Sequence, residues 1–445
     1  MKTPIADFLS AYAARDVARF HMPGHKGRGA FGVARFDITE VAGADVLYHS
    51  DGVIGESEAN ATALFGTAHT FYSAEGSTLA IKAMLALVLA DAPRGTRPRV
   101  LAARNAHKAF LFAAALLDFD VTWLMPQKAT HLCACPLSPR DVERALASEG
   151  TLPVAVYLTS PDYLGNVADI RGIAAVCKKW GVPLLVDNAH GAYLRFLSPS
   201  KHPMDLGATM CADSAHKTLP ALTGAAYLHI ARDAAPRYVA DAPAALSLFA
   251  STSPSYLVLQ SLDLCNAVLA DGYAKRLADT VARVAEMRER LTAKGFVFYG
   301  VEPLKLTLHA AACGYTGEAL ADLLRLQGIE PEFADAEFLV LMITPDNTAA
   351  ECNRLEAALA AIPPLAPLDA QVLALLTPVR VLSPREALLS PAEEIPVDGA
   401  VGRVLAAPTV SCPPAVPILM SGELIDAEAV SQFKKYGLTR VRVVK

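Results

Sequence analysis

The stretch Pro183-Leu184-Leu185-Val186-Asp187-Asn188-Ala189-His190-Gly191 decides the fold class. Its apolar run is short and ends in an aspartate, which is typical of a strand buried on both faces of a parallel sheet. Similar strand-like runs lie at 99–103, 121–124 and 154–158. They alternate with helical patterns at 77–89, 105–117 and 170–180. This alternation predicts an α/β fold with a mostly parallel sheet, in which ligands bind at the carboxyl ends of the strands.

The segment Asp213-Ser214-Ala215-His216-Lys217 contains the strongest candidate for a catalytic residue. Lys217 stands among small and apolar residues, and partial desolvation favours the neutral amine, the form that condenses with an aldehyde. Ser214 and His216 are hydrogen-bond donors suited to a phosphate. Taken alone, such a segment is more often an ordinary loop lysine beside a hydroxyl.

Asp187 follows its apolar strand directly and is therefore expected at the ligand-binding edge of the sheet. A carboxylate there can pair with a protonated pyridine nitrogen and keep the ring an electron sink. The alternative is a helix N-cap, a position that aspartate commonly fills. A strand-end aspartate followed one strand later by Ser-x-His-Lys is rarer than either feature alone, which favours the first interpretation.

Two further motifs complete a cofactor site. Gly76, Ser77 and Thr78 open an apolar helix, whose N–H groups and dipole attract an anion, although plain capping gives the same pattern. His107 lies between a strand and a helix, where its ring can stack on an aromatic group, although a lone histidine is more often structural. Together the motifs supply a phosphate cradle, a stacking group, a pyridinium partner and an amine. We therefore predict that the cofactor is pyridoxal 5′-phosphate (PLP).

The length of 445 residues predicts more than one core, since domains have roughly 100–200 residues each. Residues 1–55 show no sustained helical period and are interpreted as an N-terminal arm. Residues 56–261 form the predicted PLP-binding large domain. Residues 262–445 begin with a long bridging helix at 262–294 and continue into a smaller α/β C-terminal domain.

Composition excludes several classes of protein. Hydrophobic residues make up 53% and charged residues 19% of the chain, which excludes a disordered protein. The net charge of -5 comes without a basic run, so no nucleic-acid partner is expected. No apolar segment is long enough to span a membrane, and the first residues lack the apolar segment expected of a signal peptide. Eight scattered cysteines, of which only Cys133 and Cys135 are close, predict a reducing cytoplasm and no metal site.

The order of these motifs resembles the fold-type-I PLP-dependent enzymes, and the sequence is more narrowly similar to the Orn/Lys/Arg decarboxylase family in its short form. The similarity covers nearly the whole chain. The matching segments are FHMPGHKG at 20–27, DITE at 37–40, HTF at 69–71, GST at 76–78, NAHK at 105–108, DNAHG at 187–191, SAHK at 214–217, TSPSY at 252–256, SPREA at 383–387 and CPP at 412–414.

Carried over by position, the resemblance implies a role for each site residue. Lys217 would be the Schiff-base lysine and Asp187 the pyridinium partner. His107 would stack on one face of the ring and Ala189 on the other. The residues that would hold the phosphate are Ser77, Thr78, Ser214, His216 and, across a dimer interface, Thr252 or Ser253.

The resemblance also implies a reaction. The enzyme would be a lyase that decarboxylates arginine, lysine or ornithine to a di- or polyamine in the cytoplasm, as a homodimer or larger homo-oligomer. Lys217 or His216 would return a proton to the carbon atom that has lost carbon dioxide. The chain departs from the common family pattern at Asn188, where many members have glutamate, and at Ala74-Glu75 before Gly76. These changes leave PLP binding intact but affect the prediction of the substrate.

Two rival functions remain open. An aminotransferase or a β/γ-lyase would share the fold, and Arg380 or Arg385 would be available to hold a substrate carboxylate. A non-catalytic PLP-binding protein is the second rival. The segment from His21 to Lys26 either lines the mouth of an active site across a dimer or serves as a structural arm.

Overall fold

The computed structural model describes residues 1–445 apart from 16, 31, 127–130, 149, 369–375 and 409–414. The chain divides into two compact units, each built from separate stretches of sequence. The first unit contains Met1–Pro98, Leu146–Leu158 and Ile170–Lys275. The second unit contains Arg99–Ala145, Thr159–Asp169 and Arg276–Lys445. The CPP motif at 412–414 lies outside the described residues.

The first unit holds five strands of the large sheet. Its elements in chain order are α1 (Pro4–Ala14), η1 (Ala34–Phe36), α2 (Val53–Phe65), β1 (His69–Ser73), α3 (Gly76–Leu89), β4 (Ala155–Thr159), α6 (Ile170–Trp180), β5 (Leu184–Asp187), η2 (Ala192–Phe196), η3 (Pro203–Leu206), β6 (Met210–Asp213), α7 (Ala215–Thr218), β7 (Ala226–Ile230), α8 (Pro236–Ser247) and α9 (Tyr256–Ala270).

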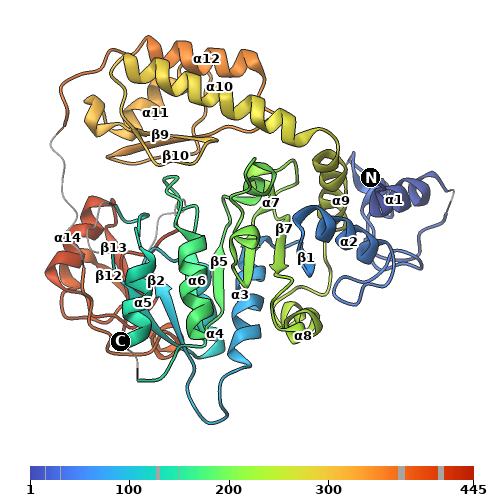
Figure 1. The fold of residues 1–445 in the computed structure, drawn as a ribbon, viewed down its shortest axis with the longest axis horizontal. Helices are drawn as coiled ribbons and strands as arrows, with labels where there is room; N and C mark the ends of the chain where they lie inside the picture. The colour runs from blue at the N-terminus through green and yellow to red at the C-terminus, as the bar shows by residue number, and fades with distance from the viewer. Residues whose placement is uncertain (16, 31, 127–130, 149, 369–375, 409–414) are drawn as a thin grey trace. The chain divides into compact units, whose positions relative to one another are not determined.

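The large sheet has seven strands in all, of which those in the first unit follow the order β1-β7-β6-β5-β4 (Figure 1). β5 and β6 run parallel, with Asp187 beside Ala212, so their carboxyl ends lie next to each other. β7 is antiparallel to both β1 and β6. Every residue of β5 and β6 is buried, as the continuously apolar sequence predicts for strands covered on both faces. The α/β fold class with a mostly parallel sheet is confirmed.

The second unit contains the other two strands of the large sheet and two small sheets. Its elements are β2 (Arg99–Ala103), α4 (Lys108–Leu117), β3 (Asp120–Leu124), α5 (Pro139–Ser148), α10 (Tyr273–Ala293), β8 (Phe298–Tyr299), β9 (Lys305–His309), η4 (Ala311–Cys313), α11 (Gly317–Arg325), β10 (Phe333–Ala334), β11 (Phe338–Met342), α12 (Ala349–Ala360), α13 (Pro384–Leu389), β12 (Ala392–Pro396), η5 (Val397–Gly399), α14 (Ala427–Lys435) and β13 (Arg440–Val444).

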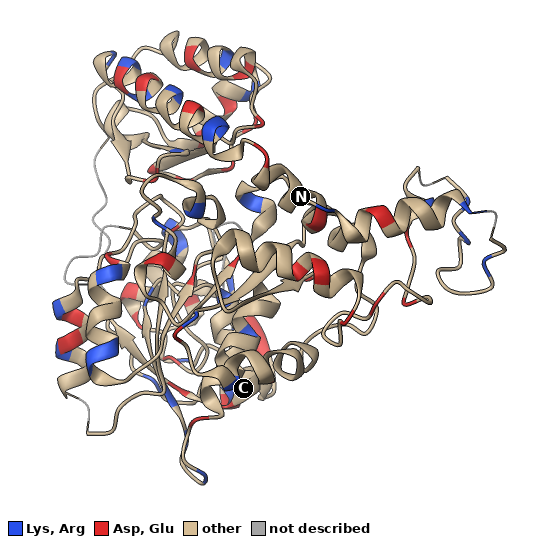
Figure 2. Cartoon of the chain, turned by 45° about the vertical axis from the view of Figure 1, so that its right-hand side comes forward, with Lys and Arg blue, Asp and Glu red and all other residues tan. Residues whose placement is uncertain are grey.

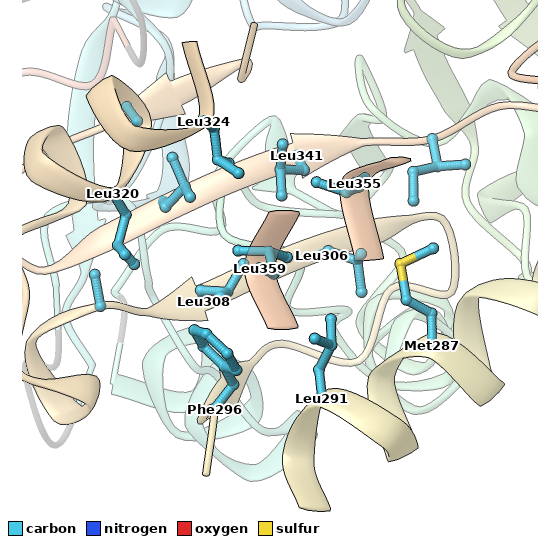
Figure 3. Packing of buried hydrophobic residues seen from close by; sticks show 14 of the residues in the cluster. Met287, Leu291, Phe296, Leu306, Leu308, Leu320, Leu324, Leu341, Leu355 and Leu359 are labelled. Atoms are coloured by element: carbon cyan, nitrogen blue, oxygen red, sulfur yellow. The ribbon is translucent and has the colours of Figure 1, made fainter. Parts of the chain in front are cut away.

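Two separate cores stabilise the second unit. The four-stranded antiparallel sheet β10-β11-β9-β8 packs against α10, α11 and α12, and side chains such as Met287, Leu306 and Leu341 interlock between them (Figure 3). A second cluster, which includes Leu405 and Phe433, lies around β12, β13 and α14. Burial of this apolar surface is the main favourable contribution to folding.

Two sequence expectations about helices are wrong. The first 55 residues contain α1, whose buried Ile5, Leu9 and Tyr12 recur at helical spacing. This helix is short, and only the proline at its start marks it locally. The long helix predicted at 262–294 is two helices, α9 and α10, because Gly272 between them adopts a positive φ of 70°.

The described helices include none that is both long and apolar enough to cross a membrane. Acidic and basic residues are interspersed along the helices rather than segregated by sign (Figure 2). This mixed distribution agrees with the composition, which gave no reason to expect a polyanionic partner.

Candidate active site

Lys217 lies on the short helix α7, which directly follows β6 at its carboxyl end. Its Nζ is 3.1 Å from Nε2 of the buried His190, which belongs to the loop after β5. The amine and the imidazole therefore share a hydrogen bond. The two loops that the sequence singled out meet at this point.

Asp187 ends β5 and is 2% exposed. Its Oδ2 accepts a hydrogen bond of 3.2 Å from the Tyr157 hydroxyl on β4, and its Oδ1 accepts one of 3.2 Å from the Ala189 amide. Burial raises the pKa of this carboxyl, and the nearby Lys217 ammonium works against that rise. A buried carboxylate of this kind is stabilised by any cationic N–H group placed against it.

The predicted phosphate loop and the lysine segment are in contact. The Ser214 hydroxyl donates a hydrogen bond of 2.8 Å to the Ser77 hydroxyl at the start of α3. Gly76 has a φ of 72°, and the position of a Cβ there has no atom within 4 Å. The Gly76 amide itself donates to the carbonyl of Gly224, whereas the next N–H groups of the first turn have no acceptor within the helix.

His216 is oriented by a backbone bond. Its Nδ1 donates to the carbonyl of Ala225 at 2.8 Å, so Nε2 is the nitrogen left to face a ligand. Burial lowers the pKa of His216, and the neighbouring Lys217 lowers it further. The hydroxyl of Thr218, one residue beyond Lys217, is a buried group without a hydrogen-bond partner among the described residues.

These residues fit PLP. The open space at Gly76 and the hydroxyls of Ser77 and Ser214 suit a phosphate, while the buried Asp187 suits a protonated ring nitrogen. The amine of Lys217 suits the aldehyde.

Thr78, His107 and Thr252 are predicted site residues that these contacts do not include. His107 belongs to the second unit, where its Nδ1 accepts a hydrogen bond of 3.1 Å from the Ala109 amide and caps α4. Thr252 is exposed between Ser251, whose amide donates to Oε1 of Glu75, and Ser253. Ring stacking by His107 and a contact of Thr252 with the phosphate stay predictions.

Sequence reasoning missed a buried polar cluster behind the site. Donor atoms of four fully buried residues lie within 4.8 Å of one another, which is also the composition of a metal site; the residues are His202, Cys211, Asp213 and His229. Oδ2 of Asp213 accepts hydrogen bonds from Nε2 of His202 at 2.9 Å and from Nε2 of His229 at 3.1 Å. The ligand spacings of local metal motifs are absent from the sequence, so no local pattern indicated this cluster.

Sequence reasoning also missed a pocket of about 530 Å³ in the second unit. Carboxylates from the segment 330–337 line it, together with His131, Arg325 and Lys435. Asp335 is paired with His131 and Glu337 with Lys435, whereas Glu332 accepts from the Tyr163 hydroxyl at 2.7 Å. The run of acids in GIEPEFADAE was the signal available in the sequence.

Comparison with solved structures identifies the fold. A structure described as SPT with PLP superposes with a TM-score of 0.55 at 14% identity, covering 72% of this chain and 79% of that one. The lysine decarboxylase LdcF of Francisella novicida superposes with a TM-score of 0.81 at 16% identity, covering 100% of this chain and 81% of that chain. The architecture is therefore that of the fold-type-I PLP-dependent enzymes.

The sequence comparison defines the family. The model of the protein family described as Orn/Lys/Arg decarboxylase, major domain, matches residues 3–307 of this chain. An arginine decarboxylase of Bacillus anthracis is 29% identical over 98% of this chain and 93% of its own length. The uncharacterized protein YaaO of Bacillus subtilis is 31% identical over 98% of this chain and 94% of its own length. The chain belongs to the Orn/Lys/Arg decarboxylase family and is an amino acid decarboxylase.

Proposed function

We propose that the protein decarboxylates a basic amino acid, with arginine as the preferred substrate, and releases the corresponding amine. The observation that carries the proposal is the placement of Lys217 and Asp187 at the carboxyl ends of two adjacent parallel strands. Four relatives that align with at least 95% of this chain are named arginine decarboxylase.

Bound PLP supplies an electron sink for the pair of electrons left when the carboxylate departs. In the proposed mechanism, Lys217 would hold the cofactor through its amine, and Asp187 would keep a proton on the ring nitrogen. Ala189 would lie against one face of the ring, and stacking by His107 stays a prediction. The groups that would hold the phosphate are Gly76, Ser77, Thr78, Ser214, His216 and, from a second copy of the chain, Thr252.

Proton movement in this mechanism falls to residues next to the amine. Lys217 and His216 are the candidates for returning a proton to the α-carbon. His190 shares a hydrogen bond with Lys217 at 3.1 Å. This contact allows His190 to take up or supply a proton as the lysine changes its charge. We propose that the enzyme works in the cytoplasm as a homodimer or larger homo-oligomer.

The contacts of two arginines disfavour transamination. Arg380 donates to Oδ1 of Asp120 at 2.9 Å, and Arg385 donates to the carbonyls of Ala115 and Leu116. Both guanidinium groups are thus engaged by the β3 and α4 region of the same unit. An aminotransferase generally needs such an arginine for the substrate carboxylate.

The test measures carbon dioxide and keto acid from arginine, lysine and ornithine with PLP-loaded protein. We expect stoichiometric carbon dioxide and amine, with arginine giving the largest kcat/KM. The variant Lys217→Ala is the control and should lose both turnover and the visible band of the lysine-bound cofactor. Keto acid formed without carbon dioxide would contradict the proposal, and so would wild-type protein that binds no PLP.

A further inference from the structure

Four consecutive residues at the end of β5, 187–190, make contacts in two different environments. Asp187 and Ala189 are joined by their own hydrogen bond, and His190 contacts the Lys217 amine. Asn188 is different because both of its donors are used by β6. Its backbone amide donates to the carbonyl of Ala212 at 2.9 Å, and its Nδ2 donates to Oδ1 of Asp213 at 2.6 Å.

Asp213 is a buried carboxylate with well-defined partners. It ends β6, has no exposed surface, and receives N–H groups from three different segments of the chain. Asn188 occupies Oδ1, while His202 and His229 share Oδ2. Burial alone would raise the pKa of the Asp213 carboxyl, but the two imidazoles outweigh this effect and hold that pKa below its usual range.

The position of Asp213 connects the two segments that carry the site. On one side it holds Asn188, and thereby the loop that begins with Asp187. On the other side it directly precedes Ser214, whose hydroxyl reaches Ser77. A change at Asp213 therefore acts on the ring-nitrogen partner and on the phosphate loop without contacting the cofactor.

We propose that the Asn188–Asp213 pair is a positioning device for the cofactor site, in which Asp213 fixes the residues 187–190 through the Asn188 amide. The proposal rests on the function proposed above, since it assigns a role relative to bound PLP. Asparagine is required at position 188 because an acidic side chain there would face the ionised Asp213 at hydrogen-bond distance.

The same side chains could instead bind a metal ion, but the hydrogen bonds of His202 argue against it. Its Nδ1 accepts from the Met204 amide at 3.4 Å, so the ring proton is on Nε2, which points at Asp213. A histidine that binds a metal through Nε2 carries its proton on Nδ1 and donates it to an acceptor. The Met204 amide is a donor and cannot serve as that acceptor.

The test compares Asn188→Asp with Asn266→Asp, a matched control. Asn266 is also fully buried and its Nδ2 donates to the Ser57 carbonyl and the Tyr72 hydroxyl, away from the site. For each variant, the dissociation constant of PLP is measured by titrating apoprotein, kcat and KM are determined, and thermal unfolding is followed. Asn188→Ala is the milder variant in case Asn188→Asp does not fold.

We expect Asn188→Asp to raise the dissociation constant of PLP by about tenfold or more and to lower kcat with little change in KM. Asn266→Asp should lower the unfolding temperature while PLP binds within about twofold of wild type, since its lost bond lies outside the site. The double variant Asn188→Asp/Asp213→Asn restores one N–H···O bond with donor and acceptor exchanged, and should recover part of the PLP affinity.

Three outcomes would overturn the inference. Wild-type PLP affinity in folded Asn188→Asp and Asn188→Ala would show that the pair positions nothing. An equal loss of affinity in Asn266→Asp would show a general effect of destabilisation. One tightly bound metal ion per purified chain, lost in His202→Ala, would assign the cluster to a metal. Each outcome leaves decarboxylation by the wild type standing, whereas absence of PLP binding by the wild type itself refutes the proposed function.

Discussion

At the scale of single residues, the behaviour of the site depends on where protons reside. Asp187 is buried, so its ionised carboxylate is stable only when a cation lies against it. Lys217 and His190 share a hydrogen bond, and His216 is kept neutral by burial. The charge of each group is thus set by its neighbours, and loading with a cofactor that carries a phosphate and a basic ring nitrogen changes all of them together.

We predict that Asp187→Asn lowers kcat by about 100-fold or more, a loss typical of removing a group that controls a proton in the transition state. An amide has nearly the shape of the carboxylate but gives no charge to keep the ring nitrogen protonated. Carbon dioxide release under saturating PLP measures the effect. A variant that retains wild-type kcat would rule out Asp187 as the pyridinium partner.

The second residue-scale prediction concerns pH. Burial lowers the pKa of His216 in the free protein, so its imidazole is neutral near pH 7, whereas a bound phosphate dianion favours the protonated form and raises that pKa. Binding therefore takes up a proton, and the affinity for PLP should fall as pH rises from about 6 to 8. In His216→Gln this contribution should disappear, leaving only the titration of the phosphate. An unchanged pH dependence in the variant would contradict the role.

Sequence patterns singled out Asp187 and Lys217 as candidates. Asp187 stood out because it directly follows a short apolar run, and Lys217 because it stands among small and apolar residues. Tyr157 was missed because it lies within such a strand, where an aromatic residue is indistinguishable from core. His202 and His229 were missed because one caps η3 and the other lies in β7, and only the tertiary fold brings them to Asp213.

At the scale of elements, a buried ion pair joins the start of the β2–α4 loop to the C-terminal region of the second unit. Arg104 donates to both carboxylate oxygens of Glu423, at 3.1 and 2.9 Å, and the two side chains are 12% and 4% exposed. Glu423 also accepts from the Met420 amide. Such a bidentate pair fixes geometry as well as charge.

We predict that Glu423→Gln destabilises the second unit by about 3 kcal/mol, because removing one partner leaves the Arg104 guanidinium buried without its counter-charge. Thermal unfolding measures the loss. The control is Glu356→Gln, which breaks the exposed pair of Arg290 with Glu356 between α10 and α12 and should change stability little. If both substitutions lowered the free energy of unfolding equally, burial of the Arg104–Glu423 pair would not increase its contribution to stability.

The boundaries of helices and strands show which local sequence signals are sufficient to predict where an element begins and ends. α6 and β2 were predicted to the residue because their periodic runs have clear ends. α1 is marked locally only by the proline at its start, and a single glycine at 272 divides α9 from α10 within an otherwise continuous helical pattern. A glycine inside a helical pattern is compatible with continuation, so the break was not predictable from the local sequence.

At the scale of the whole molecule, the compact units are each assembled from three stretches of chain. When only the sequence is known, the simplest division is into contiguous domains, here with boundaries at residues 55 and 261. These boundaries remain predictions. The α/β class followed from periodicity. The exchange of segments between the units did not, because it depends on strand order rather than on composition.

We predict that PLP stabilises the whole protein by mass action. At a free PLP concentration 100 times the dissociation constant, the expected gain is about 2.7 kcal/mol, visible as a rise in unfolding temperature that grows with PLP concentration. Lys217→Ala should show a smaller rise at every concentration because it cannot form the covalent link. An unfolding temperature independent of PLP in wild type would contradict binding to the native state.

The pairing of β1 with β7 has a consequence for synthesis of the chain on the ribosome. The hydrogen bond between Thr70 and His229 joins residues 159 positions apart, and in the first unit β1 has β7 as its neighbour. At about 5–20 residues per second, translation needs roughly 8–30 s to bring the second strand after the first. During that interval Phe71 and Tyr72 are part of a nascent chain in which the partner strand has not yet been made. We therefore expect the yield of folded protein in cells to depend on chaperones that bind this segment.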